Sequence, residues 1–225
     1  MKSVPVIGSD TVYISGYNTP ENDPGKQVKI PSFEEALAAE DANHDGKLSL
    51  AEIHDPKLKR YFPFEDLNRD GFLDASEWRL YQASMAAENG LLALRLGGRG
   101  DVTRTSLRWK YQKSIPQLPS PLLYRNVLYM INDGGVLSTF DPETGALLQQ
   151  SRLHGAIDHY YASPVAADGK VFLVSQSGVV TVLKAGGKPE VLTVHELDDE
   201  SYATPAIADG RIYIRTRSAL YCFGR

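Results

Sequence analysis

The feature that most constrains the fold of this 225-residue chain is a short pattern that occurs four times. The two clearest copies begin at Pro164 and Pro205. Each reads proline, a short apolar stretch, Asp-Gly, a basic residue and an apolar–aromatic–apolar triplet. Looser copies begin at Pro5 and Pro121, and in all four an aromatic residue lies eight positions after the proline. Such self-similarity is typical of a fold built from one repeated unit.

Each copy predicts a β-hairpin that continues into further antiparallel strands. The dipeptides Asp168-Gly169 and Asp209-Gly210 accept the positive φ values that tight hairpin turns need. A third strand is expected in every copy and a fourth in three of them, at 91–95, 136–140, 179–183 and 219–223, and at 107–111, 146–150 and 191–194. Four antiparallel strands in about 40 residues make a propeller blade. We therefore predict a mainly β fold, a partial β-propeller of about four four-stranded blades.

The spacing of the prolines locates an insertion in the first blade. Pro121 and Pro164 are 43 residues apart and Pro164 and Pro205 are 41 apart, but Pro5 and Pro121 are 116 apart. We expect residues 1–17 to form the first strands of blade one and residues 18–90 to form an inserted domain. Residues 91–225 would then supply the rest of blade one and three further blades. A β-sandwich with chance similarity is disfavoured because four copies agree in register.

Two twelve-residue segments of the insertion match D-x-N-x-D-G-x5-E, the calcium loop of an EF-hand. Calcium takes six to eight oxygen ligands, which this spacing supplies from positions 1, 3, 5, 7, 9 and 12, while the glycine at position 6 permits a sharp turn. Asp-rich loops also occur as surface turns, but two complete copies favour two calcium sites. The predicted ligands are Asp41, Asn43, Asp45, Lys47 (through its carbonyl), Ser49 and Glu52, and Asp66, Asn68, Asp70, Phe72 (carbonyl), Asp74 and Glu77.

Helices should flank these two loops. A capping box that begins at Ser32 predicts an entering helix over 33–40, and residues 74–88 predict the last helix. Pro56 and Pro63 should limit the linking helices to a turn or two. The three methionines of the chain do not cluster, so no Met-rich groove is indicated. Because calcium sensors expose such a groove, a structural role for calcium is favoured over a sensing role.

Composition narrows the classes of function that are open to this chain. The formal net charge of the chain is −4. The two loops carry −2 and −3 and the rest of the chain carries +1, so the acidity belongs to the predicted metal sites. This balance argues against nucleic-acid binding, which calls for a basic face. No apolar run approaches the length of a membrane span, and no signal peptide is evident in this chain. The single cysteine, Cys222, excludes an internal disulfide and should be buried in an apolar strand.

The repeats resemble the PQQ-like β-propeller family, which includes quinoprotein dehydrogenases and BamB-type assembly factors. The resemblance rests on Leu-Ser-Thr-Phe-Asp-Pro-Glu-Thr-Gly at 137–145 and on the blade openings Tyr-Ala-Ser-Pro at 161–164 and Tyr-Ala-Thr-Pro at 202–205. It implies an extracytoplasmic or periplasmic protein. Quinoprotein enzymes of the family close eight blades around the quinone and often use a vicinal disulfide, which one cysteine forbids. We therefore do not expect bound PQQ, and we favour a non-enzymatic protein without a catalytic residue.

Three functions remain open at this stage. The first is a calcium-binding propeller that acts as a protein-interaction scaffold, with a protein partner on the propeller face. The second is a quinone-dependent oxidoreductase or a fragment of one, which rests on the resemblance alone. The third is a carbohydrate- or small-ligand-binding module that uses a face near Tyr160, Tyr161 and Tyr202. We favour a partial propeller over a homodimer in which two copies close an eight-bladed ring.

Overall fold

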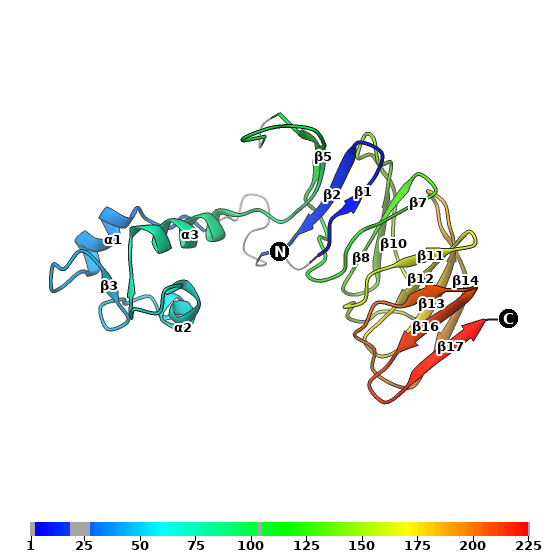
Figure 1. Cartoon of the computed structure of the whole chain (residues 1–225). Coiled ribbons are helices and arrows are strands. Elements are labelled where there is room, and N and C mark those ends of the chain that lie inside the picture. Colours follow the sequence, from blue (N-terminus) through cyan, green and yellow to red (C-terminus); the bar gives the residue numbers. More distant parts are fainter. Residues whose placement is uncertain (1–2, 19–27, 103–104, 225) are drawn as a thin grey trace. The chain divides into compact units, whose positions relative to one another are not determined.

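The computed structural model describes residues 3–18, 28–102 and 105–224. Residues 1–2, 19–27, 103–104 and 225, which fall within the expected domains, lie outside the described residues. The chain divides into two compact units, one made of Met1–Tyr17 with Asn89–Arg225 and the other of Asn18–Glu88 (Figure 1). No helix in the described ranges combines the length and apolar character that crossing a membrane requires.

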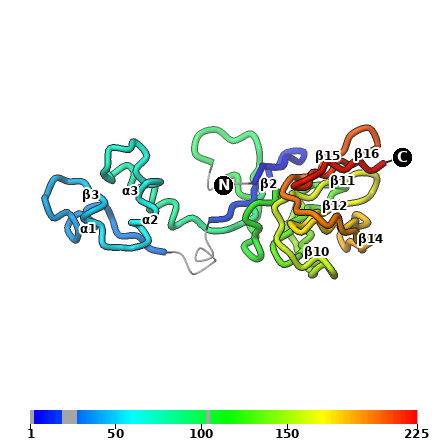
Figure 2. Tube along the Cα trace, turned by 90° about the horizontal axis from the view of Figure 1, so that it is seen from below, coloured from blue at the N-terminus to red at the C-terminus, as the bar shows by residue number. Residues whose placement is uncertain are grey.

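The larger unit consists of antiparallel sheets that follow one another in chain order (Figures 1 and 2). The first sheet has the order β1 (Val6–Ile7), β2 (Thr11–Gly16), β5 (Gly90–Arg95) and β6 (Leu107–Tyr111). The second consists of β7 (Leu122–Tyr124), β8 (Val127–Asn132), β9 (Val136–Phe140) and β10 (Leu147–Arg152). The third consists of β11 (Val165–Ala167), β12 (Lys170–Val174), β13 (Val179–Lys184) and β14 (Glu190–Glu196). The fourth consists of β15 (Ala206–Ala208), β16 (Arg211–Arg215) and β17 (Leu220–Gly224).

These sheets are the blades of a partial propeller, which confirms the predicted fold class. The first strands of the blades are neighbours, because β7 lies beside β1 and β11, and β11 lies beside β15. Three sheets have four strands, and the fourth has three within the described residues. The inserted unit leaves the first blade after β2 and returns at β5, and these two strands pair with each other along six residues from Thr11 to Gly16.

The hairpins of the repeat form through the turns that the sequence predicts. Asp168-Gly169 has φ values of 48° and 70°, and Asp209-Gly210 has 50° and 72°. Arg125-Asn126, at the same place in the second blade, has 49° and 57°. Because both central residues have positive φ, the turns match the right-handed twist of the paired strands.

Two of the hydrophobic clusters in the larger unit hold neighbouring blades together. The first cluster joins blades two and three, and its fully buried members include Tyr129, Ile131, Val171 and Leu183. The second joins blades one and two and has Phe140 among its fully buried residues. Side chains alternate between the two faces of a strand, and five consecutive residues of β8 are buried, so this blade contributes to the core on both of its faces.

Cys222 departs from the prediction, because its side chain is exposed rather than buried in an apolar strand. It lies in β17, which pairs with β16 and with no other strand among the described residues. The neighbouring side chains of Leu220 and Phe223 are also 64% and 44% exposed. The apolar sequence of β17 is that of a central strand, but its position is at an edge.

The smaller unit contains α1 (Phe33–Glu40), β3 (Leu48–Ser49), α2 (Pro56–Glu65), β4 (Phe72–Leu73) and α3 (Ala75–Ala86). Its core gathers apolar side chains from every element, namely Ala36, Leu48, Ile53, Leu58, Phe62, Leu73, Trp78, Tyr81 and Met85. The capping box of α1 is present, with the Ser32 side chain accepting from the Glu35 N–H and the Glu35 side chain accepting from the Ser32 N–H. The predicted bounds of the first helix are therefore confirmed.

The prediction that the linking helices have only a turn or two is wrong, because one ten-residue helix, α2, connects the loops. Pro56 stands in its first turn, where a missing N–H has little cost, and Asp55 caps that end by accepting from the Lys57 N–H. Pro63 lies in the last turn, so the break in hydrogen bonding that it causes comes where the helix is about to end. The same helix therefore leaves the first loop and enters the second.

Candidate metal centre

Both predicted calcium loops start at an aspartate that ends a helix. The Asp41 N–H donates to the Leu37 carbonyl at 3.0 Å, and the Asp66 N–H donates to the Phe62 carbonyl at 2.9 Å. Each aspartate is 8% exposed. The last helical turn thus fixes the backbone of the position 1 residue and directs a nearly buried carboxylate into the loop that follows.

In the first loop, carboxylate and amide oxygens accept the backbone N–H groups of the turn. The two carboxylate oxygens of Asp41 accept from Asp45 at 3.2 Å and from Gly46 at 3.0 Å. The Asn43 side-chain oxygen accepts from the Asp45 N–H at 2.8 Å, and Asp45 Oδ1 accepts from the Lys47 N–H at 2.9 Å. Gly46 adopts a φ of 79°, which explains why glycine is needed at this point of the loop.

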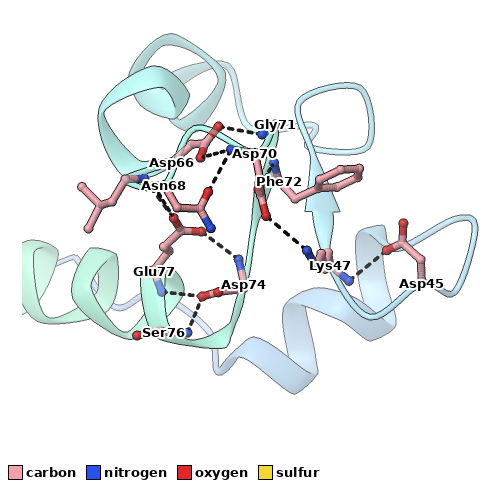
Figure 3. A network of polar contacts seen from close by, with 11 residues as sticks. Asp45, Lys47, Asp66, Asn68, Asp70, Gly71, Phe72, Asp74, Ser76 and Glu77 are labelled. Carbon is pink, nitrogen blue, oxygen red and sulfur yellow. Dashed lines mark hydrogen bonds and ion pairs between the residues drawn. The ribbon is translucent and has the colours of Figure 1, made fainter.

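The second loop repeats these four bonds at the same positions (Figure 3). Asp66 accepts from Asp70 at 3.2 Å and from Gly71 at 3.0 Å. Asn68 accepts from the Asp70 N–H at 2.8 Å, and Asp70 Oδ1 accepts from the Phe72 N–H at 3.0 Å. Gly71 has a φ of 87°. The two segments therefore share their folded conformation as well as their sequence pattern.

The short strands β3 and β4 join the two loops. Leu48 pairs with Leu73 and Ser49 pairs with Phe72, so each loop meets the other at its position 8. Both leucine side chains are completely buried in the core of the unit. This pairing holds the two loops side by side and fixes which residues of one can reach the other.

Glu77, at position 12 of the second loop, turns back toward the start of its loop. Its Oε1 accepts from the backbone N–H of Leu67 at 2.9 Å and of Asn68 at 3.2 Å, and its Oε2 accepts from the Asp74 N–H at 3.1 Å. The side chain is 5% exposed and begins in the first turn of α3. Asp74, at position 9, caps that helix by accepting from the N–H groups of Ser76 and Glu77.

Glu52, at position 12 of the first loop, makes a different set of contacts. Its Oε2 accepts from the Ser49 N–H at 2.9 Å and from the Ser49 hydroxyl at 2.7 Å. The Ser49 hydroxyl is the main reason that the pKa of Glu52 lies below its usual value, with the backbone N–H groups of Ser49, Asn43 and Ala42 adding to the effect. The carboxylate is therefore held in its ionised form, which is the form that binds a metal.

All twelve predicted ligand residues lie in these two loops, and their oxygen chemistry fits a hard cation. The donors are carboxylates, amide and hydroxyl oxygens and backbone carbonyls, the set that calcium prefers. Within the described ranges, no three His, Cys, Asp or Glu side chains converge closely enough to hold a metal ion as they stand. The carboxylates instead accept backbone N–H groups, which orients them within each loop.

The sequence pattern does not predict one contact between the loops. The ammonium group of Lys47, at position 7 of the first loop, lies 3.2 Å from Asp70 Oδ2, at position 5 of the second. The calcium-loop pattern leaves the side chain at position 7 free to vary, so the pattern itself gives no reason to single out Lys47. Only the β3–β4 pairing brings the two residues together.

The tyrosine face proposed for a carbohydrate is partly formed. The rings of Tyr161 and Tyr202 lie 5.1 Å apart and are 37% and 49% exposed. Tyr160 does not belong to this face, because it is 3% exposed and its hydroxyl donates to the Ala156 carbonyl at 2.9 Å. Its burial raises its pKa, as expected for a phenol enclosed by apolar neighbours. Of the three tyrosines, only Tyr161 and Tyr202 are therefore exposed.

Comparison with protein families gives two matches. The family described as outer membrane protein assembly factor BamB matches residues 82–225, and the EF-hand family matches residues 61–80. The second match contains all of the second loop from Asp66 to Glu77. No curated protein matches the chain.

The solved structures that match this chain have low sequence identity to it. BamB from Moraxella catarrhalis is 23% identical over 60% of this chain and 41% of its own, with a TM-score of 0.46. A europium-containing methanol dehydrogenase is 14% identical over 48% of this chain and 21% of its own, with a TM-score of 0.37. The computationally designed Ika4 protein is 15% identical over 61% of this chain and 86% of its own, with a TM-score of 0.44. The chain thus spans less than half the length of the Moraxella protein.

Proposed function

The chain belongs to the family of the outer membrane protein assembly factor BamB, and we propose that it is a propeller protein that binds calcium through the inserted EF-hand pair. The inserted EF-hand pair holds two calcium ions, one in each loop. The observation that carries the proposal is the repetition of the same four backbone-to-side-chain hydrogen bonds, position by position, in both loops. Two unrelated acidic turns have no reason to share this network.

The proposed ligands are oxygens at the same six positions of each loop. Carboxylate, amide and hydroxyl oxygens come from Asp41, Asn43, Asp45, Ser49 and Glu52, and from Asp66, Asn68, Asp70, Asp74 and Glu77. The backbone carbonyls of Lys47 and Phe72 complete the two sets. The two loops together carry a formal charge of −5, so two divalent cations relieve most of the repulsion among their carboxylates.

We further propose that calcium has a structural role in this unit. Because α2 is shared by the two loops, each site borders both α2 and one other helix of the unit. Met85 is buried in the core of the unit, so its side chain does not line an exposed groove of the kind that calcium sensors use. Calcium would therefore stabilise a small helical core whose elements are otherwise joined by long loops.

The propeller would act as a protein-interaction scaffold outside the cytoplasm. This part of the proposal draws on the name of the family, which describes an assembly factor of the outer membrane. Calcium outside cells reaches about 10⁻³ M, enough to fill even weak EF-hand sites. Fractionation of the source cells tests the location, because recovery of the protein with the cytoplasmic fraction would contradict it.

Calorimetric titration with calcium tests the central proposal. The full chain should take up two calcium ions, and the double variant Glu52→Gln, Glu77→Gln should take up none, because each substitution removes a charged oxygen at position 12. Glu34→Gln is the matched control, since Glu34 is exposed in the first turn of α1 and lies outside both loops. Unchanged heat in the double variant would refute the proposal. Molar mass with and without calcium tests the homodimer that would close an eight-bladed ring.

A further inference from the structure

Lys47 places a positive charge from the first loop on a predicted ligand of the second. Its Nζ lies 3.2 Å from Asp70 Oδ2 and 5.3 Å from the centre of the Phe72 ring (Figure 3). The side chains of Lys47 and Asp70 are 44% and 37% exposed, so water screens the pair only in part. The same ammonium group therefore lies over the aromatic ring and beside the carboxylate.

The position of Lys47 follows from the pairing between the loops. Lys47 directly precedes β3, and the next two residues pair with Leu73 and Phe72 of β4. Continued by one residue, this register sets Lys47 opposite Asp74, and the Lys47 side chain reaches on to Asp70 in the same loop. Asp70 Oδ1 accepts from the Phe72 N–H at 3.0 Å, so the second oxygen is the one that faces Lys47.

The first loop lacks an equivalent cation. Asp45, at position 5, uses Oδ2 to accept from the Asn43 side-chain amide at 3.0 Å. The residue of the second loop that corresponds to Lys47 is Phe72, which has no charge to offer in return. Between described residues, the Lys47–Asp70 pair is the one ion pair that involves a predicted ligand carboxylate. The two sites therefore differ in their electrostatics although their backbones agree.

We propose that Lys47 is an affinity-determining residue of the second calcium site, where its ammonium group competes with the metal for Asp70. This inference rests on the proposed calcium binding and adds an asymmetry to it. A unit charge that remains beside a divalent cation opposes binding, and a few ångströms from the carboxylate the partly screened repulsion lowers affinity about three- to tenfold. The first site, without such a cation, escapes this penalty and fills first.

The test compares Lys47→Met with the wild-type lysine in a chain that also carries Glu52→Gln, so that only the second loop binds. Methionine keeps the backbone carbonyl and a flexible, unbranched side chain, and it removes the ammonium group with its charge. At low ionic strength, calorimetry should give a calcium affinity about three to ten times higher for Lys47→Met, Glu52→Gln than for Glu52→Gln alone. About 1 M salt should remove most of this difference.

Two further variants test whether the charge of Lys47 is what lowers the calcium affinity. Lys47→Arg keeps the charge and should leave the affinity within about twofold of the lysine chain. Lys57→Met removes an exposed lysine of α2 outside the loops and controls for the change in net charge. In the chain without Glu52→Gln, Lys47→Met should shift one of the two binding steps and leave the other in place, a result that does not depend on disabling the first loop.

The outcomes separate this inference from the proposed function. If the wild-type chain takes up no calcium, both fail. If it takes up two calcium ions and Lys47→Met leaves the second affinity unchanged or makes it weaker, only the role of Lys47 fails. A weaker affinity would show that the lysine orients Asp70 for the metal instead of competing with it.

Discussion

The backbone N–H of Ser120 donates a hydrogen bond of 2.9 Å to the Oγ of Ser163, across two neighbouring blades. The bond recurs along the propeller, because the Val4 N–H donates to Ser120 Oγ at 2.8 Å and the Ser163 N–H donates to Thr204 Oγ1 at 3.0 Å. Each of these four residues directly precedes the proline that begins a blade. A hydroxyl at this position therefore ties each blade to the one before it, next to a proline that has no N–H to offer.

Replacing Ser163 by alanine tests this link. The substitution leaves the Ser120 N–H without its acceptor in a partly buried place, which should lower the free energy of unfolding of the propeller by about 1–2 kcal/mol. Ser163→Thr is the control and should be close to wild type, because Thr204 makes the same bond in the next blade. Urea denaturation gives the measurement. An alanine variant as stable as the threonine variant would show that the link contributes nothing.

Removing calcium should disturb Trp78 and spare Trp109. Trp78 lies in the core of the smaller unit, 5.6 Å from the Tyr81 ring, and its Nε1 donates to the Pro31 carbonyl at 2.9 Å. If calcium is structural, a chelator should loosen this core and shift the Trp78 emission to longer wavelength in a Trp109→Phe chain. The reciprocal Trp78→Phe chain reports on the propeller through Trp109 and should show no shift. Equal behaviour of the two chains would contradict a role confined to the smaller unit.

Elements whose determinants are local can be predicted from the sequence. The turn at Asp168-Gly169 was predictable because those two residue types supply the required backbone angles by themselves. The capping box at Ser32 likewise places the start of α1 through a contact three residues away. Repetition strengthens the inference of the hairpins, since four copies of one pattern reduce the ambiguity of each copy. The last blade also shows its three strands, β15, β16 and β17, as the repeat predicts.

The features that the sequence does not predict depend on contacts with residues distant in the chain, which a local pattern does not show. Pro56 and Pro63 predict linking helices of only a turn or two, but packing of Leu58 and Phe62 in the core supports one ten-residue helix. Cys222 was expected to be buried because its strand is apolar, although burial depends on a strand pairing beyond it. The contact of Lys47 with Asp70 needs the register of β3 and β4, which spans both loops.

Replacing Gly145 should destabilise the propeller, because its backbone has a positive φ and an aromatic ring fills the space that a Cβ would need. Its φ is 72°, and a Cβ at this position would lie 2.5 Å from Trp109 Cδ2. Gly145→Ala should therefore lower the free energy of unfolding by about 2–4 kcal/mol. Gly155 is a matched control, with a φ of 69° and open space around its Cα, so Gly155→Ala should cost only about 1 kcal/mol.

Thermal or urea unfolding of the two alanine variants measures the difference, which isolates the contact with Trp109 from the backbone strain. Trp109 also donates from Nε1 to the Pro142 carbonyl at 3.0 Å, so the ring has little freedom to move away. Equal losses in the two variants would show that the ring yields to the added methyl group.

Asp199 should make the stability of the propeller depend on pH in the acid range. Its Oδ2 accepts from the Ser218 hydroxyl at 2.6 Å and from the Ser218 N–H at 2.8 Å, and these bonds lower the pKa of Asp199 from 3.8 to about 2. Because the pKa is lower in the folded state than in the unfolded state, the contribution is fully present above about pH 4. It is lost as the pH falls from there toward 2. Asp199→Asn removes the titrating group and should flatten this part of the profile.

Urea unfolding at a series of pH values between about 5 and 2 measures the effect through the slope of stability against pH. Ser218→Ala should raise the pKa of Asp199 toward its ordinary value, because it removes the hydroxyl that contributes most to the shift. Asp198→Asn, one residue earlier, is the control for loss of a charge that does not bond to Ser218. If the slopes of the wild type and of Asp199→Asn coincide over this range, the bond to Ser218 has no influence on acid stability.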